Sequence, residues 1–246
     1  MVSKNKSNIV TIMDIDFVNE TKEKFLTEYV YPKLTHNQKC FIVTANPEIV
    51  MKTRESKAFK KLVKQANYVV PDGVGIVYAS KFKKQLIKER IPGYDLMRDL
   101  LAKADQESYS CYFLGAKEHV NEKVVEQIKQ KYPNITIAGH HHGYISINDN
   151  SIADKIASSH PDLIFVALGS PRQEEWITTH MNKFNKGLFM GVGGSFDVIA
   201  GEVKRAPDAW INLNLEWLYR LLKQPFRWKR ILKVLEFMAR IYFKKE

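Results

Sequence analysis

Short apolar runs that alternate with longer polar, periodic segments are the feature of this sequence that most constrains its fold. The runs are IVTIMDI, KCFIVTA, NYVVP, YSCYFLG, NITIAG, DLIFVALG and GLFMGVG. This alternation predicts βαβ units, and runs that are apolar throughout, such as FIVTA and IFVALG, are typical of strands buried on both faces. We therefore predict an α/β fold, a Rossmann-like and mostly parallel sheet with helices on both faces, plus a helical C-terminal appendage.

The last part of the chain differs in character from the rest. We place the α/β core at residues 1–207 and a basic amphipathic appendage at residues 208–246, interrupted near Pro225 because proline has no amide hydrogen. From Arg220 onward there are nine lysines and arginines and two glutamates, so much of the net charge of +11 lies there. The apolar residues of this segment follow the spacing of one helix face: Trp228, Ile231, Leu232, Leu235, Met238, Ala239 and Tyr242.

Composition narrows the compartment and the kind of partner. The positive charge predicts contact with phosphate, nucleic acid or an anionic membrane surface. Cys40 and Cys111 lie in apolar runs without C-x-x-C spacing, which indicates free thiols in a reducing compartment. We see no secretory signal at the start and no run near the roughly 18 to 20 apolar residues that span a bilayer. We therefore expect a cytoplasmic protein.

Polar side chains follow several of the predicted strands, where a parallel sheet binds its ligands. Asp72 follows NYVVP, Thr44 and Asn46 follow a neighbouring run, and Gln173 follows IFVALGS. Partial burial at a strand end raises the pKa of a carboxyl toward that of a working base, so Asp72 is a candidate general base. Thr44 and Asn46 are placed to orient a sugar hydroxyl. A simple P-D-G turn also explains Asp72 and, taken alone, is the favoured interpretation.

Glycines after the last predicted strand are candidates for an anion site. Gly193, Gly194 and Ser195 follow GLFMGV, so their amides could face an anion at a helix start. Tight packing between strand and helix explains the same glycines equally well. GVGGSF does not match G-x-G-x-x-G, and G-x-x-x-x-G-K-[ST] does not occur, so the dinucleotide and P-loop fingerprints are absent.

Two clusters suggest a metal at first sight. His140, His141 and His142 are adjacent, but neighbouring side chains of a strand point in alternating directions and rarely share one ion. Asp14 and Asp16 form a D-x-D pair, which strand alternation also produces. We expect no metal here and leave the role of these five residues open.

Six blocks of the sequence together resemble one family. The blocks are TANPEIV, VVPDGVGIV, RIPGYDLM, LGSPRQEEW, GVGGSFDVIAGEVKRAP and LEWLYRLLKQPFRWKR. In order and spacing they are similar to the WecG/TagA/CpsF glycosyltransferases, from about residue 9 to about residue 235. The length and basic tail most resemble the TagA/TarA branch. That branch transfers N-acetylmannosamine from UDP-N-acetylmannosamine to undecaprenyl-diphosphate-linked N-acetylglucosamine, the first committed step toward the wall teichoic acid linkage unit.

The resemblance implies roles for individual residues. Asp72 matches the proposed catalytic base, and Thr44, Asn46 and Gln173 match pocket residues around the donor and the reacting sugar. The tail arginines that match those thought to close over the donor diphosphate are Arg220, Arg227 and Arg230. The resemblance also implies inverting transfer, no metal or cofactor, and a symmetric homo-oligomer. With its basic and aromatic residues, the tail suits a peripheral helix on the inner face of the cell membrane.

Other functions stay open at this stage. The same fold and lipid acceptor could serve another UDP-sugar, such as the uronic acid of N-acetylmannosamine or another hexosamine. A nucleotide-dependent oxidoreductase is disfavoured because the glycine fingerprint is missing. A noncatalytic module that binds nucleic acid or membrane through the basic tail is more remote, and we expect no nucleic-acid partner.

Overall fold

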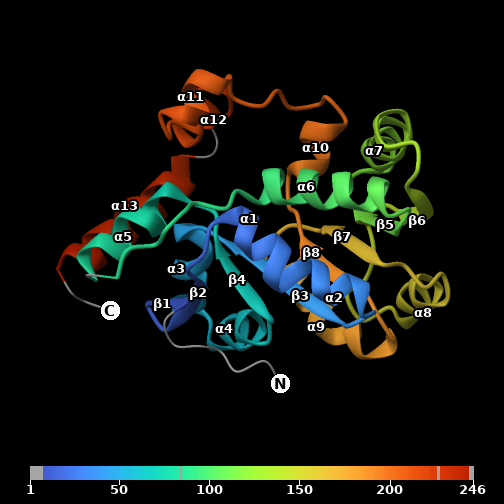
Figure 1. Ribbon diagram of the computed structural model, residues 1–246. Helices are drawn as coiled ribbons and strands as arrows, with labels where there is room; N and C mark the ends of the chain where they lie inside the picture. The colour runs from blue at the N-terminus through green and yellow to red at the C-terminus, as the bar shows by residue number, and fades with distance from the viewer. Residues whose placement is uncertain (1–7, 84, 226–227, 244–246) are drawn as a thin grey trace.

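A single parallel sheet organises the chain. The structure, a computed structural model, describes residues 8–83, 85–225 and 228–243. Within these ranges six strands form the sheet in the order β4-β3-β8-β7-β5-β6, with every neighbouring pair parallel (Figure 1). The strands are β3 (Cys40–Ala45), β4 (Tyr68–Pro71), β5 (Ser110–Gly115), β6 (Thr136–His141), β7 (Leu163–Ala167) and β8 (Leu188–Gly191). The predicted α/β fold is confirmed.

The first apolar run does not join this sheet. We predicted a strand of the sheet at IVTIMDI, but β1 (Ile9–Ile12) and β2 (Ile15–Val18) instead form a separate antiparallel hairpin. Its turn residues Met13 and Asp14 both have positive φ, 49° and 62°. Two successive residues with positive φ make the tight turn whose twist matches a two-stranded hairpin.

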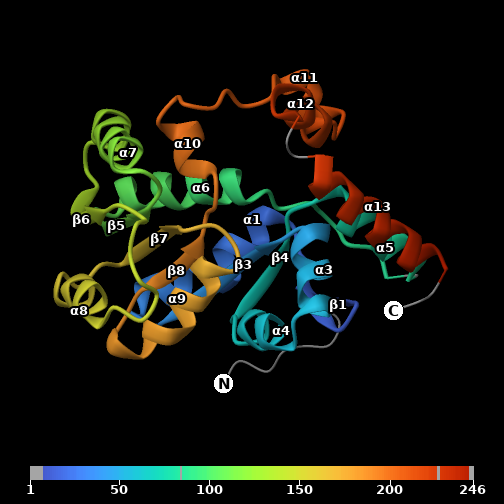
Figure 2. The ribbon, with the colours of Figure 1, turned by 180° about the vertical axis from the view of Figure 1, so that it is seen from behind.

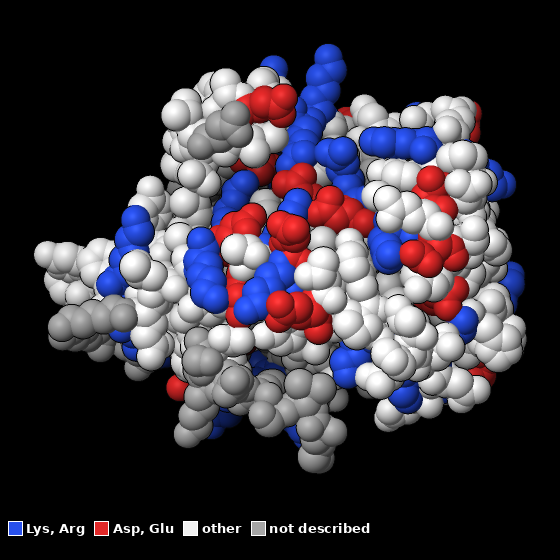
Figure 3. Space-filling model, in the orientation of Figure 1, with Lys and Arg blue, Asp and Glu red and all other residues white. Residues whose placement is uncertain are grey.

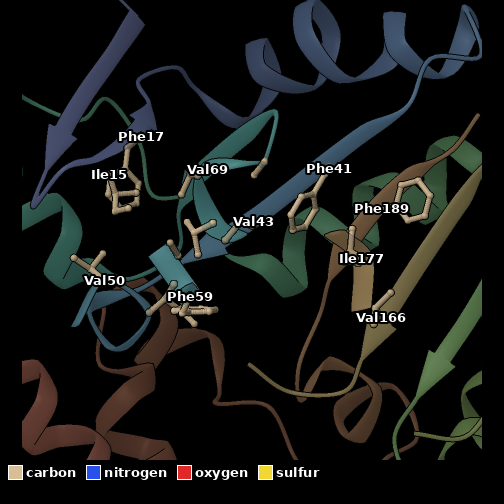
Figure 4. Packing of buried hydrophobic residues seen from close by; sticks show 14 of the residues in the cluster. Ile15, Phe17, Phe41, Val43, Val50, Phe59, Val69, Val166, Ile177 and Phe189 are labelled. Atoms are coloured by element: carbon tan, nitrogen blue, oxygen red, sulfur yellow. The ribbon is translucent and has the colours of Figure 1, made fainter. Parts of the chain in front are cut away.

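Helices cover both faces of the sheet, as predicted. One face carries α3 (Pro47–Glu55), α4 (Lys57–Lys64), α8 (Asn150–Ser158) and α9 (Arg172–His180), together with the hairpin. Phe59 of α4 and Ile177 of α9 lie in the same cluster as Phe41 and Phe189 of the sheet (Figure 4). The opposite face carries η2 (Phe25–Val30), α2 (Tyr31–Thr35), α6 (Gly93–Gln106), α7 (Glu118–Lys131) and α10 (Ser195–Ile199). The strands β3, β5, β7 and β8 are therefore buried on both sides, which is why they are mostly apolar, whereas the edge strand β6 is partly exposed and carries His140 and His141.

Shorter elements complete the chain. α1 (Lys22–Lys24) precedes η2, α5 (Val74–Phe82) follows β4, and η3 (Met181–Lys183) follows α9. Of these, α5 matters most for the site, because it begins two residues after Asp72.

In the described part of the C-terminal segment, three helices are present, and the second of them ends before Pro225, near which the break was predicted. They are α11 (Asp208–Asn212), α12 (Glu216–Lys223) and α13 (Trp228–Tyr242). Figures 1 and 2 show α11 and α12 as a lobe reached through the extended segment after α10, while α13 lies beside α5 and α3. Phe237 and Ile241 of α13 are buried in the cluster on the α3 face of the sheet. The boundary at residue 208 stays a prediction, but α13 shares the hydrophobic core of the preceding residues.

Candidate active site

Asp72 lies at the carboxyl edge of the sheet. It follows β4 directly, and its backbone N–H donates to the Ala45 carbonyl at the end of β3, 3.0 Å away. Chain order runs outward from β3 to β4 on one side of the sheet and from β5 to β6 on the other, with β8 and β7 between them. Such a change of direction opens a crevice at the carboxyl ends of the strands. Asp72 therefore stands where a sheet of this kind binds its ligand.

Gly93 joins Asp72 to Thr44. As the first residue of α6, Gly93 donates its backbone N–H to the Asp72 carboxylate. A Cβ at position 93 would lie only 2.9 Å from Thr44 Oγ1, so the close approach requires glycine. The Ile91 N–H donates to the Pro71 carbonyl at 2.8 Å and holds this segment beside β4. Thr44 and Asp72, predicted from two different strands, are thus brought together through one backbone position.

Asn46 lies against the same turn. Its Oδ1 accepts from the Ile49 N–H at 3.0 Å and caps α3, in which Pro47 is the first residue. A Cβ at Gly73 would lie 2.7 Å from Pro47 Cδ and 3.2 Å from Asn46 Cβ, so the two turns pack tightly. The cap uses Oδ1 of Asn46, whereas the two N–H donors of this side chain are on Nδ2.

Three charged side chains act on Asp72. Burial raises the pKa of Asp72 to about 6, and the charge of Glu216 acts in the same direction. Arg220, the Gly93 N–H and Arg90 oppose this rise. Arg220 and Glu216 belong to α12, so the C-terminal lobe brings charges to Asp72, while the predicted role of Arg220 at the diphosphate stays a prediction. A carboxyl with a pKa near neutrality, flanked by cations, is suited to proton transfer beside a developing negative charge.

Of the other two predicted tail arginines, Arg230 lies within the described residues and contacts the core. Arg230, in the first turn of α13, approaches Glu48 of α3 with 3.7 Å between Nε and Oε2. Glu48 lies two residues after Asn46, so Arg230 reaches the same end of α3. Arg227 lies outside the described residues.

Gln173 is built into the end of β8. Its side chain is buried, its Nε2 donates to Glu174 Oε1 at 2.8 Å, and its Oε1 accepts from the Gly193 N–H at 3.1 Å. A Cβ at Gly191 would lie 2.5 Å from Gln173 Nε2. Gln173 and Gly193 are therefore brought together beside β3, the strand that carries Thr44.

Two backbone N–H groups of the glycine loop, residues 193–195, have hydrogen-bond partners within the protein. The Gly193 N–H is bound to Gln173, and the Ser195 N–H donates to the Val192 carbonyl at 3.0 Å. Gly194 is the N-cap residue of α10, a helix of five residues. Both explanations considered for this loop thus find support, since packing against Gln173 accounts for Gly193 while Gly194 lies at the helix start.

The two apparent metal clusters make local contacts. His140 Nδ1 lies 2.8 Å from Asn121 Oδ1, His141 Nδ1 lies 2.9 Å from the His142 carbonyl, and His142 Nδ1 accepts from the Tyr144 N–H. In the described ranges, no group of three or more His, Cys, Asp or Glu side chains has the arrangement of a metal site.

The D-x-D pair belongs to the hairpin. Asp14 in its turn pairs with Lys60 at 2.7 Å, and Asp16 accepts from Thr11 Oγ1 at 2.7 Å. These contacts account for both aspartates without a ligand.

Three residues of the site were missed by sequence reasoning. Gly93, Arg90 and Glu216 all act on Asp72, yet none was singled out. Gly93 and Arg90 lie in or beside the block RIPGYDLM, and Glu216 lies in LEWLYRLLKQPFRWKR. One signal could have pointed to these three residues: both blocks lie outside the predicted strands, yet both are among the six blocks that resemble the family.

The fold and the site together define an enzyme of the α/β class, with a carboxyl group poised at the sheet edge among arginines. The Glycosyl transferase WecG/TagA/CpsF family model matches residues 10–246, and the chain belongs to this family. A relative from Bacillus spizizenii is 41% identical over 230 residues, covering 94% of this chain and 89% of the relative. One from Staphylococcus aureus is 43% identical over 236 residues, covering 94% and 91%. Both are named N-acetylglucosaminyldiphosphoundecaprenol N-acetyl-beta-D-mannosaminyltransferase.

Proposed function

We propose that this chain is an inverting glycosyltransferase that moves N-acetylmannosamine from UDP-N-acetylmannosamine to undecaprenyl-diphosphate-linked N-acetylglucosamine, in synthesis of the teichoic acid linkage unit. Family membership and the shared name of the two relatives support this assignment. The observation that carries it is Asp72, whose pKa is raised to about 6 at a sheet edge where Arg90 and Arg220 also act.

Asp72 is the proposed general base. Inverting transfer requires that the acceptor hydroxyl lose its proton as it attacks the anomeric carbon, and a positioned carboxylate typically contributes about 10² to 10⁴ in rate. A pKa of about 6 leaves Asp72 ionised at neutral pH while making it a stronger base than an ordinary aspartate. Thr44, which packs against Gly93, and Asn46, which packs against Gly73, are the residues proposed to orient the reacting sugar.

The arginines are the proposed partners of the leaving diphosphate. As the bond to the anomeric carbon breaks, negative charge grows on the UDP oxygens and the sugar gains oxocarbenium character, by analogy with glycoside hydrolysis. Guanidinium groups make paired, charge-assisted bonds to phosphate oxygens. Arg220 acts on Asp72 and Arg230 reaches the end of α3, so the tail supplies cations to the site from two of its helices.

We propose that the tail also contacts an anionic membrane surface, where the lipid acceptor lies. The described residues contain no helix with the length and hydropathy needed to cross a bilayer. The α13 helix nevertheless exposes a stripe of apolar residues: Trp228, Leu232, Leu235 and Tyr242. Most of the visible surface of the α11–α12 lobe is uncharged (Figure 3). Exposed apolar residues beside lysines and arginines are typical of peripheral membrane helices.

Location at the inner face of the cell membrane and a symmetric homo-oligomer stay predictions.

The direct test is a transfer assay. The purified chain is incubated with UDP-N-acetylmannosamine and a short-chain lipid-diphosphate-N-acetylglucosamine, with EDTA present, and products are followed by mass spectrometry. We expect addition of one N-acetylhexosamine and release of UDP. Parallel reactions with UDP-N-acetylglucosamine and with the uronic acid of UDP-N-acetylmannosamine test the alternative donors. Preferred use of either would replace the donor, and no transfer from any of the three would contradict the proposed function.

A further inference from the structure

Glu216 is a carboxylate held between two arginines that come from different parts of the chain. Its Oε1 accepts from Arg220 Nη2 within α12, and its Oε2 lies 3.9 Å from Arg90 Nη1 of the core. The side chain is 12% exposed, against 17% for Arg90 and 40% for Arg220. Glu216 is thus the most buried member of an ion-pair chain that joins the lobe to the core beside Asp72.

Two guanidinium groups on one side of a site repel each other unless something negative lies between them. In this chain Glu216 occupies that place, with one carboxylate oxygen toward each arginine. Arg90 is tied to the sheet edge through its neighbour Ile91, whose N–H donates to Pro71. Arg220 belongs to α12, so its position relative to Asp72 depends on how the lobe docks.

We propose that Glu216 is a positioning residue that fixes Arg220 beside Arg90, so that the two guanidinium groups meet the diphosphate of the nucleotide-sugar as a preformed pair. This inference rests on the proposed function, because it assumes a diphosphate at the site. Glu216 does not contact the reacting atoms in this role. Its contribution comes through Arg220, which a flexible lobe would otherwise present in many orientations.

The chain offers a matched control for this role. Glu236 and Arg240 form the same i, i+4 pair on α13, with Arg240 Nη2 2.9 Å and Nε 3.1 Å from Glu236 Oε1. Glu236 also pairs with Lys233, within α13 itself. Glu216→Gln and Glu236→Gln therefore remove the same charge from the same kind of helical pair, in one case on α12, whose charges act on Asp72, and in the other on α13.

The experiment measures UDP binding by titration calorimetry in the full chain, well below the midpoint of thermal unfolding. We expect Glu216→Gln to weaken UDP binding about tenfold, the range for loss of a charged hydrogen-bonded partner, and Glu236→Gln to change it less than about twofold. In an Arg220→Gln background, adding Glu216→Gln should weaken binding by less than about a further twofold, because the two residues act as one unit.

Three results would overturn the proposal. One is a dissociation constant for Glu216→Gln within twofold of the parent chain. Another is a double variant in which the two losses multiply, since Glu216 would then act independently of Arg220. The third is a reduced number of binding sites with an unchanged dissociation constant, which would mean that Glu216 only keeps the lobe folded.

The readout separates this inference from the donor assignment, because UDP is common to all the candidate donors. Normal UDP binding without transfer of N-acetylmannosamine would contradict the assigned sugar and leave the role of Glu216 measurable. A parent chain that does not bind UDP would contradict both.

Discussion

At the scale of single residues, the site depends on an aspartate in an unfavourable place. Burial raises the pKa of Asp72 because the charged form loses hydration, and Arg220, the Gly93 N–H and Arg90 recover only part of that cost. A surface turn such as P-D-G would have left an ordinary carboxyl. The difference between the two interpretations of this turn is therefore made by burial, which neighbours from α6, the preceding loop and α12 offset only in part.

The raised pKa predicts the pH dependence of turnover. Asp72 must be ionised to accept a proton, so kcat/KM should fall tenfold per pH unit as the pH drops below about 6, the pKa of Asp72. The measurement is kcat/KM for the nucleotide-sugar as a function of pH, from about 4.5 to about 8.5. An acid limb centred near pH 4, the range of an unperturbed aspartate, would contradict this role.

The raised pKa of Asp72, the proposed base, also predicts a cost in folding stability. The folded pKa, about 6, lies above the unfolded value of 3.8, so Asp72 favours the folded state at low pH and loses this contribution as the pH rises through 6. Asp72→Asn should therefore raise the free energy of unfolding at pH 7.5 by on the order of 2 kcal/mol, while lowering turnover about 10² to 10⁴-fold.

Thermal unfolding at two pH values checks this stability prediction. The gain of Asp72→Asn should shrink as the pH falls below about 6 and vanish well below 3.8, where Asp72 is protonated in both states. The exposed Asp14→Asn, at the hairpin turn, serves as control for loss of one carboxylate. A variant that is active, or less stable than the parent at pH 7.5, would remove Asp72 from the assigned role.

Residue identity alone could predict part of this site. Asp72, Thr44, Asn46 and Gln173 were candidates because parallel strands deliver the residues at and after their ends to one edge, and their roles stay predictions. Arg90 and Glu216 could not be found in this way. Their importance comes from an ion pair across the docked lobe, and sequence periodicity does not predict which surfaces of the lobe and the core meet.

At the scale of elements, the start of α6 is the tightest part of the site. A methyl group at position 93 would lie 2.9 Å from Thr44 Oγ1 and 3.3 Å from both Thr44 Cβ and Cγ2. Gly93→Ala should therefore displace Thr44 or the N–H that binds Asp72. We expect about a hundredfold loss of kcat/KM and about 1 to 3 kcal/mol of destabilisation. Transfer kinetics with thermal unfolding measure both, and near-parental kinetics would show that this contact does not set the geometry.

The α13 helix shows why the hydrophobic pattern of the tail was ambiguous. The predicted apolar face ran from Trp228 to Tyr242, and the helix instead buries Phe237 and Ile241 on a different face. Apolar residues occupy both faces, so spacing alone could not decide which one meets the core. The two explanations of the tail, core packing and membrane contact, thus apply to different sides of one helix, and the second remains a proposal.

The exposed side of α13 can be tested without touching the arginines. Leu232 and Leu235 are 51% and 60% exposed, so their replacement by serine should cost little folding energy. We expect Leu232→Ser with Leu235→Ser to weaken sedimentation with anionic vesicles at least about tenfold, since each leucine contributes about 1.5 to 3 kcal/mol when removed from water. UDP binding should stay at the parental value. Unchanged vesicle binding would assign the stripe to another partner.

At the scale of the whole molecule, truncation can distinguish the two functions proposed for the tail, contact with the diphosphate and contact with a membrane surface. A chain ending at residue 224 keeps Glu216 and Arg220 on α12 and loses α13. A chain ending at residue 207 loses α12 as well as α13. We expect the longer truncation product to lose vesicle binding and keep measurable UDP binding, and the shorter one to lose vesicle binding and most of its UDP affinity. Equal UDP binding by the two products would contradict a role for α12 in the diphosphate site.

Stability needs a separate measurement in these truncations. Removal of α13 uncovers the surface that Phe237 and Ile241 bury, and loss of such side chains costs several kcal/mol. Binding should therefore be measured below the unfolding midpoint of each product.

The sheet arrangement has a consequence for how the protein is made. The core strands end at Gly191, whereas Glu216 and Arg220 reach Asp72 from helices that follow all of them in the chain. Domains generally fold as units while synthesis proceeds from the N-terminus. A nascent polypeptide can therefore complete its sheet on the ribosome before Arg220, which acts on Asp72, has been translated. If the proposed role of Arg220 holds, premature termination before α12 would leave a product with its sheet strands but without the charges that α12 brings to Asp72.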